Sequence, residues 1–85
     1  PHMKITLKLY ASLTQYLPDG AVRGEIDIDV DDASSIAAVL DSHGVPPEHC
    51  HLVLHNGLYV GPSERADAVL GDGDALAVWP PVAGG

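Results

Sequence analysis

The chain is poor in cysteine, in basic side chains and in long apolar runs, and it has no phenylalanine. Its single cysteine, Cys50, excludes an internal disulfide, which fits a reducing compartment. Four Lys and Arg against twelve Asp and Glu give a net charge of −8, a sign that repels nucleic acid and anionic membranes. No apolar run reaches the roughly 18 residues that a bilayer requires, and there is no signal-peptide pattern. We therefore expect a cytoplasmic protein that binds neither nucleic acid nor membrane.

The length sets the domain organisation. Eighty-five residues suffice for one domain with one modest core. Residues 1–2 are interpreted as an expression-tag remnant ahead of Met3. Residues 3–79 are expected to form the domain and residues 80–85 an extended tail.

Residues 3–10 and 25–30 both alternate apolar and polar side chains, which is the period of a half-buried β-strand. The outward positions carry two lysines in the first segment and three carboxylates in the second. If the two strands pair antiparallel, opposite charges face each other across the pair, which stabilises the sheet. The inward side chains are Ile5, Leu7, Leu9, Ile26, Ile28 and Val30.

One amphipathic helix is predicted over residues 34–43, because four side chains fall on one helical stripe: Ile36, Val39, Leu40 and His43. The candidate residues for its N-terminal cap are Asp31, Asp32 and Ser34, and Gly44 is its predicted stop. A short helical turn is expected earlier in the chain, over residues 12–17.

Asn56-Gly57 predicts a hairpin between strands at 52–55 and 58–60, because Asn-Gly suits a tight two-residue turn. Residues 62–70 are expected to form a turn or a short helix, and residues 71–74 a tight turn before a last strand over 75–79. A single helix has to bury its stripe against the sheet. The element order predicts an α+β fold, a β-grasp or ubiquitin-like roll, in which a mixed sheet of four to five strands packs on one main helix. The last strand is expected at its centre.

The sequence ends in Pro80-Pro81-Val82-Ala83-Gly84-Gly85. The prolines favour an extended path, and six residues reach at most roughly 20 Å. Gly84 and Gly85 carry no side chain, so the backbone can pass through a narrow channel. The segment is predicted to carry one free α-carboxylate into the active site of another protein, although the two glycines alone are also compatible with an incidental end.

Residues 72–85 resemble the C-terminal signature of the MoaD/ThiS family of ubiquitin-like sulfur carriers. The shared features are an Asp-Gly-Asp turn, an apolar strand, Pro-Pro-Val and Gly-Gly. Pro80-Pro81-Val82 is most similar to the small subunit of molybdopterin synthase, whereas Tyr10 and the lack of phenylalanine depart from those subunits.

The resemblance implies that Gly85, with Gly84 beside it, is the reactive residue. A ubiquitin-activating-like enzyme would use ATP and Mg²⁺ to adenylate the Gly85 carboxylate, and sulfur would then replace AMP to give a thiocarboxylate. The resemblance also implies that the chain binds no cofactor and is not catalytic alone. It would be the sulfur-carrying small subunit of a sulfurtransferase, inserting its tail into an acceptor such as the large subunit of molybdopterin synthase. The residues expected to contact such partners are Trp79, Pro80, Pro81, Val82 and Ala83.

Two alternatives to the molybdopterin pathway stay open. The chain could carry sulfur for thiamine or for another sulfur-containing metabolite, or it could be a ubiquitin-like modifier of proteins. Trp79 is also open to two interpretations. By alternation it faces away from Leu76 and Val78, with Tyr59 and Val53 as possible neighbours, either as an anchor for a partner or as cover for the outer sheet face.

The other candidate residues are interpreted as structural. His and Cys are common zinc ligands, but the spacing of His43, His49, Cys50, His51 and His55 does not suit one ion. We expect no bound metal and a burial or loop role for Cys50 instead of a redox one. Four aspartates are expected to form a solvated face, with a cation site or docking face as the alternative. They are Asp27, Asp29, Asp31 and Asp32.

Overall fold

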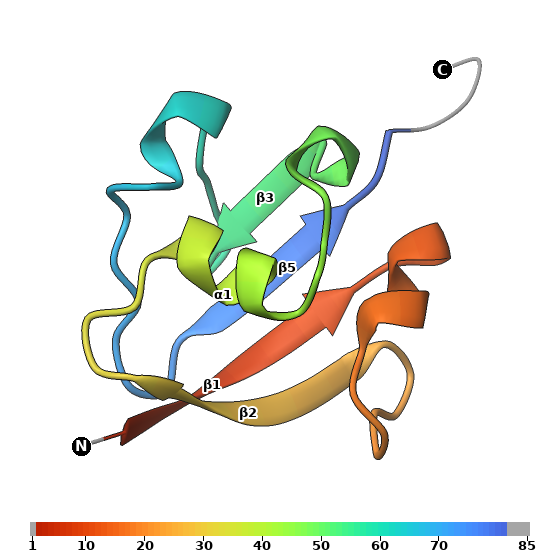
Figure 1. Ribbon diagram of the computed structural model, residues 1–85, viewed down its shortest axis with the longest axis horizontal. Helices are drawn as coiled ribbons and strands as arrows, with labels where there is room; N and C mark the ends of the chain where they lie inside the picture. Colours follow the sequence, from red (N-terminus) through yellow and green to blue (C-terminus); the bar gives the residue numbers. More distant parts are fainter. Residues whose placement is uncertain (1, 82–85) are drawn as a thin grey trace.

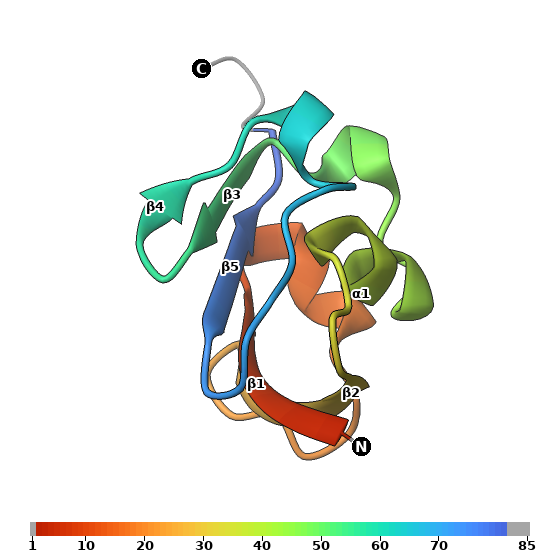
Figure 2. The ribbon, with the colours of Figure 1, turned by 90° about the vertical axis from the view of Figure 1, so that its left-hand side faces the viewer.

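A computed structural model describes residues 2–81 as a five-stranded mixed sheet with one α-helix on one of its faces (Figure 1). The spatial order of the strands is β2-β1-β5-β3-β4. Figure 2 shows the helical segments on one side of the sheet and the opposite face uncovered. The predicted α+β, β-grasp fold class is confirmed. The strands are β1 (His2–Leu9), β2 (Glu25–Asp31), β3 (Leu52–His55), β4 (Leu58–Tyr59) and β5 (Ala75–Trp79).

β1 and β2 pair antiparallel, and the outward lysines lie opposite carboxylates, as predicted. Lys4 lies opposite Asp29 and Lys8 opposite Glu25. Between these pairs, the Thr6 hydroxyl donates a 2.8 Å hydrogen bond to the Asp27 carboxylate. Within residues 2–81 neither lysine forms an ion pair, so the charges favour the pairing at long range only. β1 begins at His2, one residue ahead of the expected domain start.

A 3-10 helix, η1 (Ala11–Tyr16), opens the connection from β1 to β2 and buries Leu13, as the predicted helical turn requires. The connection returns to the sheet at Gly24, whose carbonyl accepts a 2.9 Å hydrogen bond from the Leu9 N–H. Gly24 has φ +80°, and a Cβ there would lie 2.7 Å from the Leu9 carbonyl oxygen. Only glycine allows the two backbones to approach this closely.

The helix α1 spans Ile36–Ser42, which is shorter than the predicted 34–43. The predicted caps are wrong: Ser35 is the N-cap, and its hydroxyl accepts a 3.1 Å hydrogen bond from Ala38 N–H. The N–H groups of Ile36 and Ala37, the first two of the helix, donate to the carbonyls of residues 68 and 65. The loop over 65–68 therefore satisfies N–H groups that lack a partner within the helix. The chain turns at Gly44, as predicted.

The β3–β4 turn and the position of β5 both agree with the prediction. Asn56 and Gly57 both have positive φ, as the tight turn predicted between β3 and β4 requires. β5 then runs parallel to β1 and antiparallel to β3, so the predicted central position is confirmed. Two further 3-10 helices, η2 (Pro47–His49) and η3 (Pro62–Glu64), lie in the connections on either side of the hairpin.

The core lies between the sheet and α1. Its largest fully buried side chains come from β1, η1, α1, β3 and β5: Ile5, Leu7, Leu9, Leu13, Ile36, Val53, Leu76 and Val78. The predicted inward faces of β1 and β5 are confirmed. Within residues 2–81, no helix has the length and apolarity that crossing a bilayer requires.

Candidate functional site at the base of the C-terminal segment

β5 positions the segment that carries the predicted reaction. Trp79 ends the strand, Pro80 is buried, and Pro81 is exposed. The Trp79 carbonyl accepts a 3.0 Å hydrogen bond from His51 N–H, and the preceding carbonyl of Val78 accepts one of 3.2 Å from Tyr10 N–H. The base of the segment is therefore held by backbone contacts from both sides. The four other predicted site residues lie outside the described residues: Val82, Ala83, Gly84 and Gly85.

Trp79 is half-buried and points away from the core, as predicted. One of its two predicted neighbours is wrong, since Val53 is fully buried on the core face of the sheet. The Trp79 ring instead stacks on the Tyr10 ring, with 4.4 Å between centroids and an interplanar angle of 8°. The stack joins the end of β5 to the residue that follows β1.

An apolar surface continues from this stack across the outer face of the sheet. Leu52 lies opposite Trp79, and Leu54 lies opposite Ala77 on one side and Tyr59 on the other. Tyr59 is 61% exposed. Contiguous exposed apolar surface is typical of protein interaction sites. We call this set the outer-face patch: Tyr10, Leu52, Leu54, Tyr59, Ala77 and Trp79.

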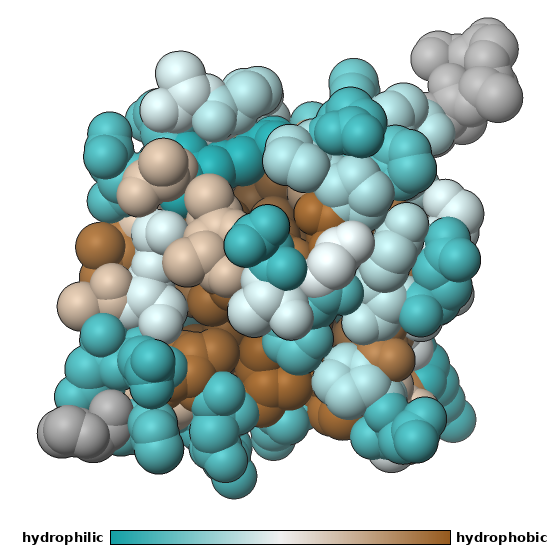
Figure 3. All heavy atoms as spheres, viewed as in Figure 1, coloured by the Kyte–Doolittle hydropathy of each residue, from teal (hydrophilic) through white to brown (hydrophobic). Residues whose placement is uncertain are grey.

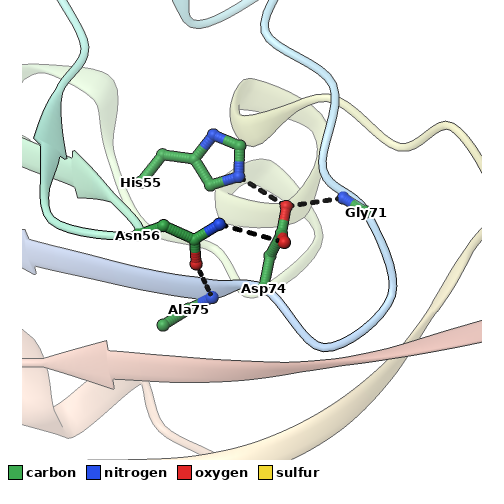
Figure 4. Close-up of polar contacts among 5 residues, drawn as sticks. All are labelled: His55, Asn56, Gly71, Asp74 and Ala75. Carbon is green, nitrogen blue, oxygen red and sulfur yellow. Dashed lines mark hydrogen bonds and ion pairs between the residues drawn. The ribbon is translucent and has the colours of Figure 1, made fainter.

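The other end of β5 is held by a polar cluster around Asp74 (Figure 4). Its carboxylate accepts a 3.0 Å hydrogen bond from the Asn56 side chain and a 2.7 Å one from Gly71 N–H, and it lies 2.5 Å from His55 Nε2. These contacts, with Asn56 the largest contributor and His55 and Gly71 next, lower the pKa of Asp74 to about 2. The Asn56 carbonyl oxygen accepts from Ala75 N–H at 2.8 Å.

This cluster positions one end of β5 in the fold. It ties the hairpin turn to the Asp-Gly-Asp turn and so fixes where β5 begins. Trp79 follows Ala75 by four residues, a separation of roughly 13 Å along a strand. The His55–Asp74 pair is therefore remote from the base of the C-terminal segment.

Arg65 is a buried basic residue that sequence reasoning missed. It is 7% exposed, and its guanidinium donates hydrogen bonds to the carbonyls of Cys50, at 2.7 Å, and His51, at 3.5 Å. Arg65 thereby clamps the segment between η2 and β3, and both Arg65 and Cys50 line a cavity of about 160 Å³. No signal in the sequence identifies this clamp, because an arginine after a turn is usually exposed.

Cys50 is buried, and burial raises the pKa of its thiol. The thiol is 3.5 Å from the Pro46 carbonyl oxygen. A thiol with a raised pKa is a poor nucleophile, so the predicted burial role fits this environment. In the described part of the chain, no three His, Cys, Asp or Glu side chains are arranged to hold one metal ion.

Comparison with protein families gives a match that covers almost the whole sequence. The family model of the Mut7-C ubiquitin domain matches residues 2–84. The chain belongs to the Mut7-C ubiquitin family. No curated protein matches it. The predicted resemblance to the ubiquitin-like carriers is confirmed by this family and by the solved structures that share its fold.

Two solved structures from Haloferax volcanii resemble this Mut7-C ubiquitin protein over nearly its whole length. The HVO 2177 protein is 31% identical, with a TM-score of 0.72, over 99% of this chain and 88% of its own. Small archaeal modifier protein 1, SAMP1, is 27% identical, with a TM-score of 0.67, over 96% of this chain and 99% of its own.

A third structure is a complex of subunits 1 and 2 of the molybdopterin-converting factor from Helicobacter pylori. The matching chain is 20% identical, with a TM-score of 0.59, over 98% of this chain and 100% of its own. At that identity the likeness shows the fold alone.

Proposed function

We propose that this protein is a sulfur carrier whose Gly85 carboxylate is adenylated and converted to a thiocarboxylate, which donates sulfur in molybdopterin biosynthesis. The observation that carries the proposal is the position of β5. It is the central strand, and its end is held on both sides. In the sequence it is followed by Pro80-Pro81-Val82-Ala83 and then by Gly84-Gly85. A tail that continues from the central strand β5 starts at a fixed position relative to the sheet surface that a partner would bind.

The chemistry is supplied by the partner enzymes. In the activating enzyme, the Gly85 carboxylate would attack the α-phosphate of ATP and release pyrophosphate, with Mg²⁺ bound to the phosphates. Hydrosulfide would then attack the acyl-adenylate, so that a C–S bond forms, the C–O bond to AMP breaks, and a proton is lost. None of the described side chains has to act as acid or base in either step. The nucleotide and metal belong to the activating enzyme, and the carrier itself needs no cofactor.

The outer-face patch is the proposed docking surface for the activating enzyme and for the acceptor synthase. It adjoins the base of the tail at Trp79, so a partner that covers the patch would receive the tail at its rim. Trp and Tyr are over-represented among the residues that dominate interface energies. The net charge of −8 would attract a partner with a basic rim and raise the association rate at low ionic strength.

A second candidate function is covalent modification of proteins. The likeness that favours it is to small archaeal modifier protein 1, at 27% identity over 96% of this chain. The modifier would share the adenylation step, but a lysine amine of a target would finally attack the activated Gly85 carbonyl. The two functions differ only in the nucleophile.

The test begins with adenylation alone. An enzyme of the ubiquitin-activating class from the same source is incubated with the chain, and exchange of labelled pyrophosphate into ATP is measured. We expect exchange with the full chain and none with a chain that lacks Gly84 and Gly85. Exchange that persists after this truncation overturns the proposal.

The second measurement identifies the nucleophile. With a sulfide donor present, intact-mass spectrometry should show a gain equal to the difference between sulfur and oxygen. The matched control is a chain extended by one residue beyond Gly85, which should gain no sulfur. Adducts to lysine in place of this gain would assign the chain as a modifier.

A further inference from the structure

The outer edge of β2 carries backbone groups that have no hydrogen-bond partner among residues 2–81. β2 is a terminal strand of the sheet, so one of its edges faces away from β1. Antiparallel residues alternate between those that bond to the neighbouring strand and those that point away from it. Leu9 N–H bonds to Gly24 O, whereas the N–H groups of Lys4 and Thr6 bond toward the β5 side. The β2 residues opposite Lys4 and Thr6, which are Asp29 and Asp27, therefore present their backbone groups at the free edge.

The flanking residues support this assignment and limit the length of the edge. Glu25 points the same way, because its N–H and C=O bond to Val22 outside the sheet. The Asp31 carbonyl accepts from Ser34 N–H at 3.2 Å. Among residues 2–81, this leaves the N–H and C=O of Asp27 and Asp29 and the N–H of Asp31 unpaired. The edge spans roughly 13 Å, enough for a short added strand.

A groove lies beside this edge on the helix side of the sheet. It has a volume of about 310 Å³. Val30 of β2 and Ala38 and Val39 of α1 contribute its apolar lining, and its other lining residues are polar: Asp29, Asp31, Ser34, Ser42 and His43. Figure 3 shows hydrophobic atoms exposed below α1, bordered by hydrophilic atoms along the lower edge of the molecule, where β2 runs in Figure 1. The inward side chains of β2 are only half-buried, so this surface is not fully covered by α1.

The other side of the edge is acidic. Asp27, Asp29 and Asp31 alternate with the inward apolar residues and are exposed. Asp29 and Asp31 also contribute to the lining of the groove, so the acidic row borders it. A strand added to β2 would place every second side chain beside these carboxylates and the intervening ones over the groove. The register therefore selects a segment in which basic and apolar residues alternate.

We propose that the free edge of β2 and the adjoining groove form a docking site for an extended basic segment of a partner protein. Backbone pairing with Asp27 and Asp29 would supply affinity, and the alternating pattern would supply specificity. A second copy of this chain fits poorly, because two β2 strands side by side would bring their aspartate rows together. The proposed site does not depend on the proposed sulfur chemistry. β4, at the other edge, has only two residues and offers a shorter template.

The probe is a short synthetic peptide in which valine and lysine alternate. A titration followed by amide NMR should perturb the N–H signals of Asp27 and Asp29 and slow their hydrogen exchange. Two control peptides separate the contributions. One has the same composition with its lysines and valines in separate blocks, and the other is N-methylated at alternate residues, which removes its donors on one edge. Both should bind about tenfold more weakly, since each loses either the register or the backbone pairing.

Variants of the protein test the charge. Asp29→Lys should weaken binding of the alternating peptide about fivefold to tenfold relative to Glu48→Lys, which changes the net charge equally at an exposed position away from the groove. Equal affinity for all three peptides would overturn the proposal. So would signal changes centred on the outer-face patch, or dimerisation of the free protein through β2 in sedimentation. The peptide comparison uses the unaltered protein, so a variant that fails to fold does not leave the proposal untested.

Discussion

Replacing Trp79 by alanine should separate its role in the fold from its role in docking. The change removes an aromatic stack with 4.4 Å between centroids, and such a pair is worth about 1 kcal/mol beyond its burial. Trp79 is half-buried, so the lost burial adds about 1 kcal/mol. We expect Trp79→Ala to lower the free energy of unfolding by about 2 kcal/mol, whereas loss of a core tryptophan costs about 3–5 kcal/mol.

The assay is urea denaturation followed by far-UV circular dichroism, because Trp79 is the only tryptophan and its fluorescence is lost with it. Leu76→Ala is the core control. Leu76 is fully buried on the same strand, and its truncation should cost about 4 kcal/mol. A double-mutant cycle with Tyr10→Ala should give a coupling energy of about 1 kcal/mol for the stack.

Affinity for the activating enzyme is then measured on the same variants. Trp79→Ala should weaken binding by about 2 kcal/mol or more if the outer-face patch docks this partner. The matched control is Leu58→Ala: Leu58 is 73% exposed but lies opposite His55, on the helix side of the sheet. Trp79 is not an outer-face anchor if Trp79→Ala destabilises the fold as much as Leu76→Ala, if the stack shows no coupling, or if Leu58→Ala weakens binding equally.

Three further predictions concern stability. The pKa of Asp74 is lowered to about 2, below its unfolded value near 4, so its contribution of about 1 kcal/mol is complete above pH 4 and lost as the pH falls toward 2. Urea midpoints of the wild type and Asp74→Asn should therefore converge over that range, and a constant difference would contradict the assignment. Gly24→Ala should cost about 2 kcal/mol in thermal unfolding, and clearly more than Gly73→Ala, which has a similar φ but an unobstructed Cβ position. Arg65→Lys should cost about 2 kcal/mol, because an ammonium group cannot reproduce the two-carbonyl clamp, and an unchanged urea midpoint would show that the clamp is dispensable.

The parts of the fold that depend on neighbouring residues could be predicted from the sequence. Alternation in β1 and β2 identifies both their faces and their pairing, and Asn56-Gly57 identifies the hairpin turn. The helix start was wrong, because Ser35 competes with three nearby polar residues as cap. The N–H groups of Ile36 and Ala37, which follow the Ser35 cap, donate to carbonyls of a loop that is distant in sequence.

The contacts missed at the candidate site depend on register between distant segments. Trp79 stacks on Tyr10 because β5 lies parallel to β1, with Leu9 opposite Val78, and no local pattern specifies that pairing. The reach of Arg65 to the Cys50 carbonyl is likewise set by the packing of two loops. To predict the free edge of β2, one has to know which residue pairs of β1 and β2 exchange hydrogen bonds, and alternation alone does not give this.

The central position of β5 has a consequence for synthesis on the ribosome. Before residues 75–79 emerge, the chain can form the β1–β2 pair, α1 and the β3–β4 hairpin, but no strand joins the two halves. Such a nascent chain exposes two unpaired strand edges and the apolar faces that Leu76 and Val78 will cover. The domain therefore closes in one late step, and only a molecule that has completed it holds Trp79 and Pro80 at the base of the segment that leads to Gly85.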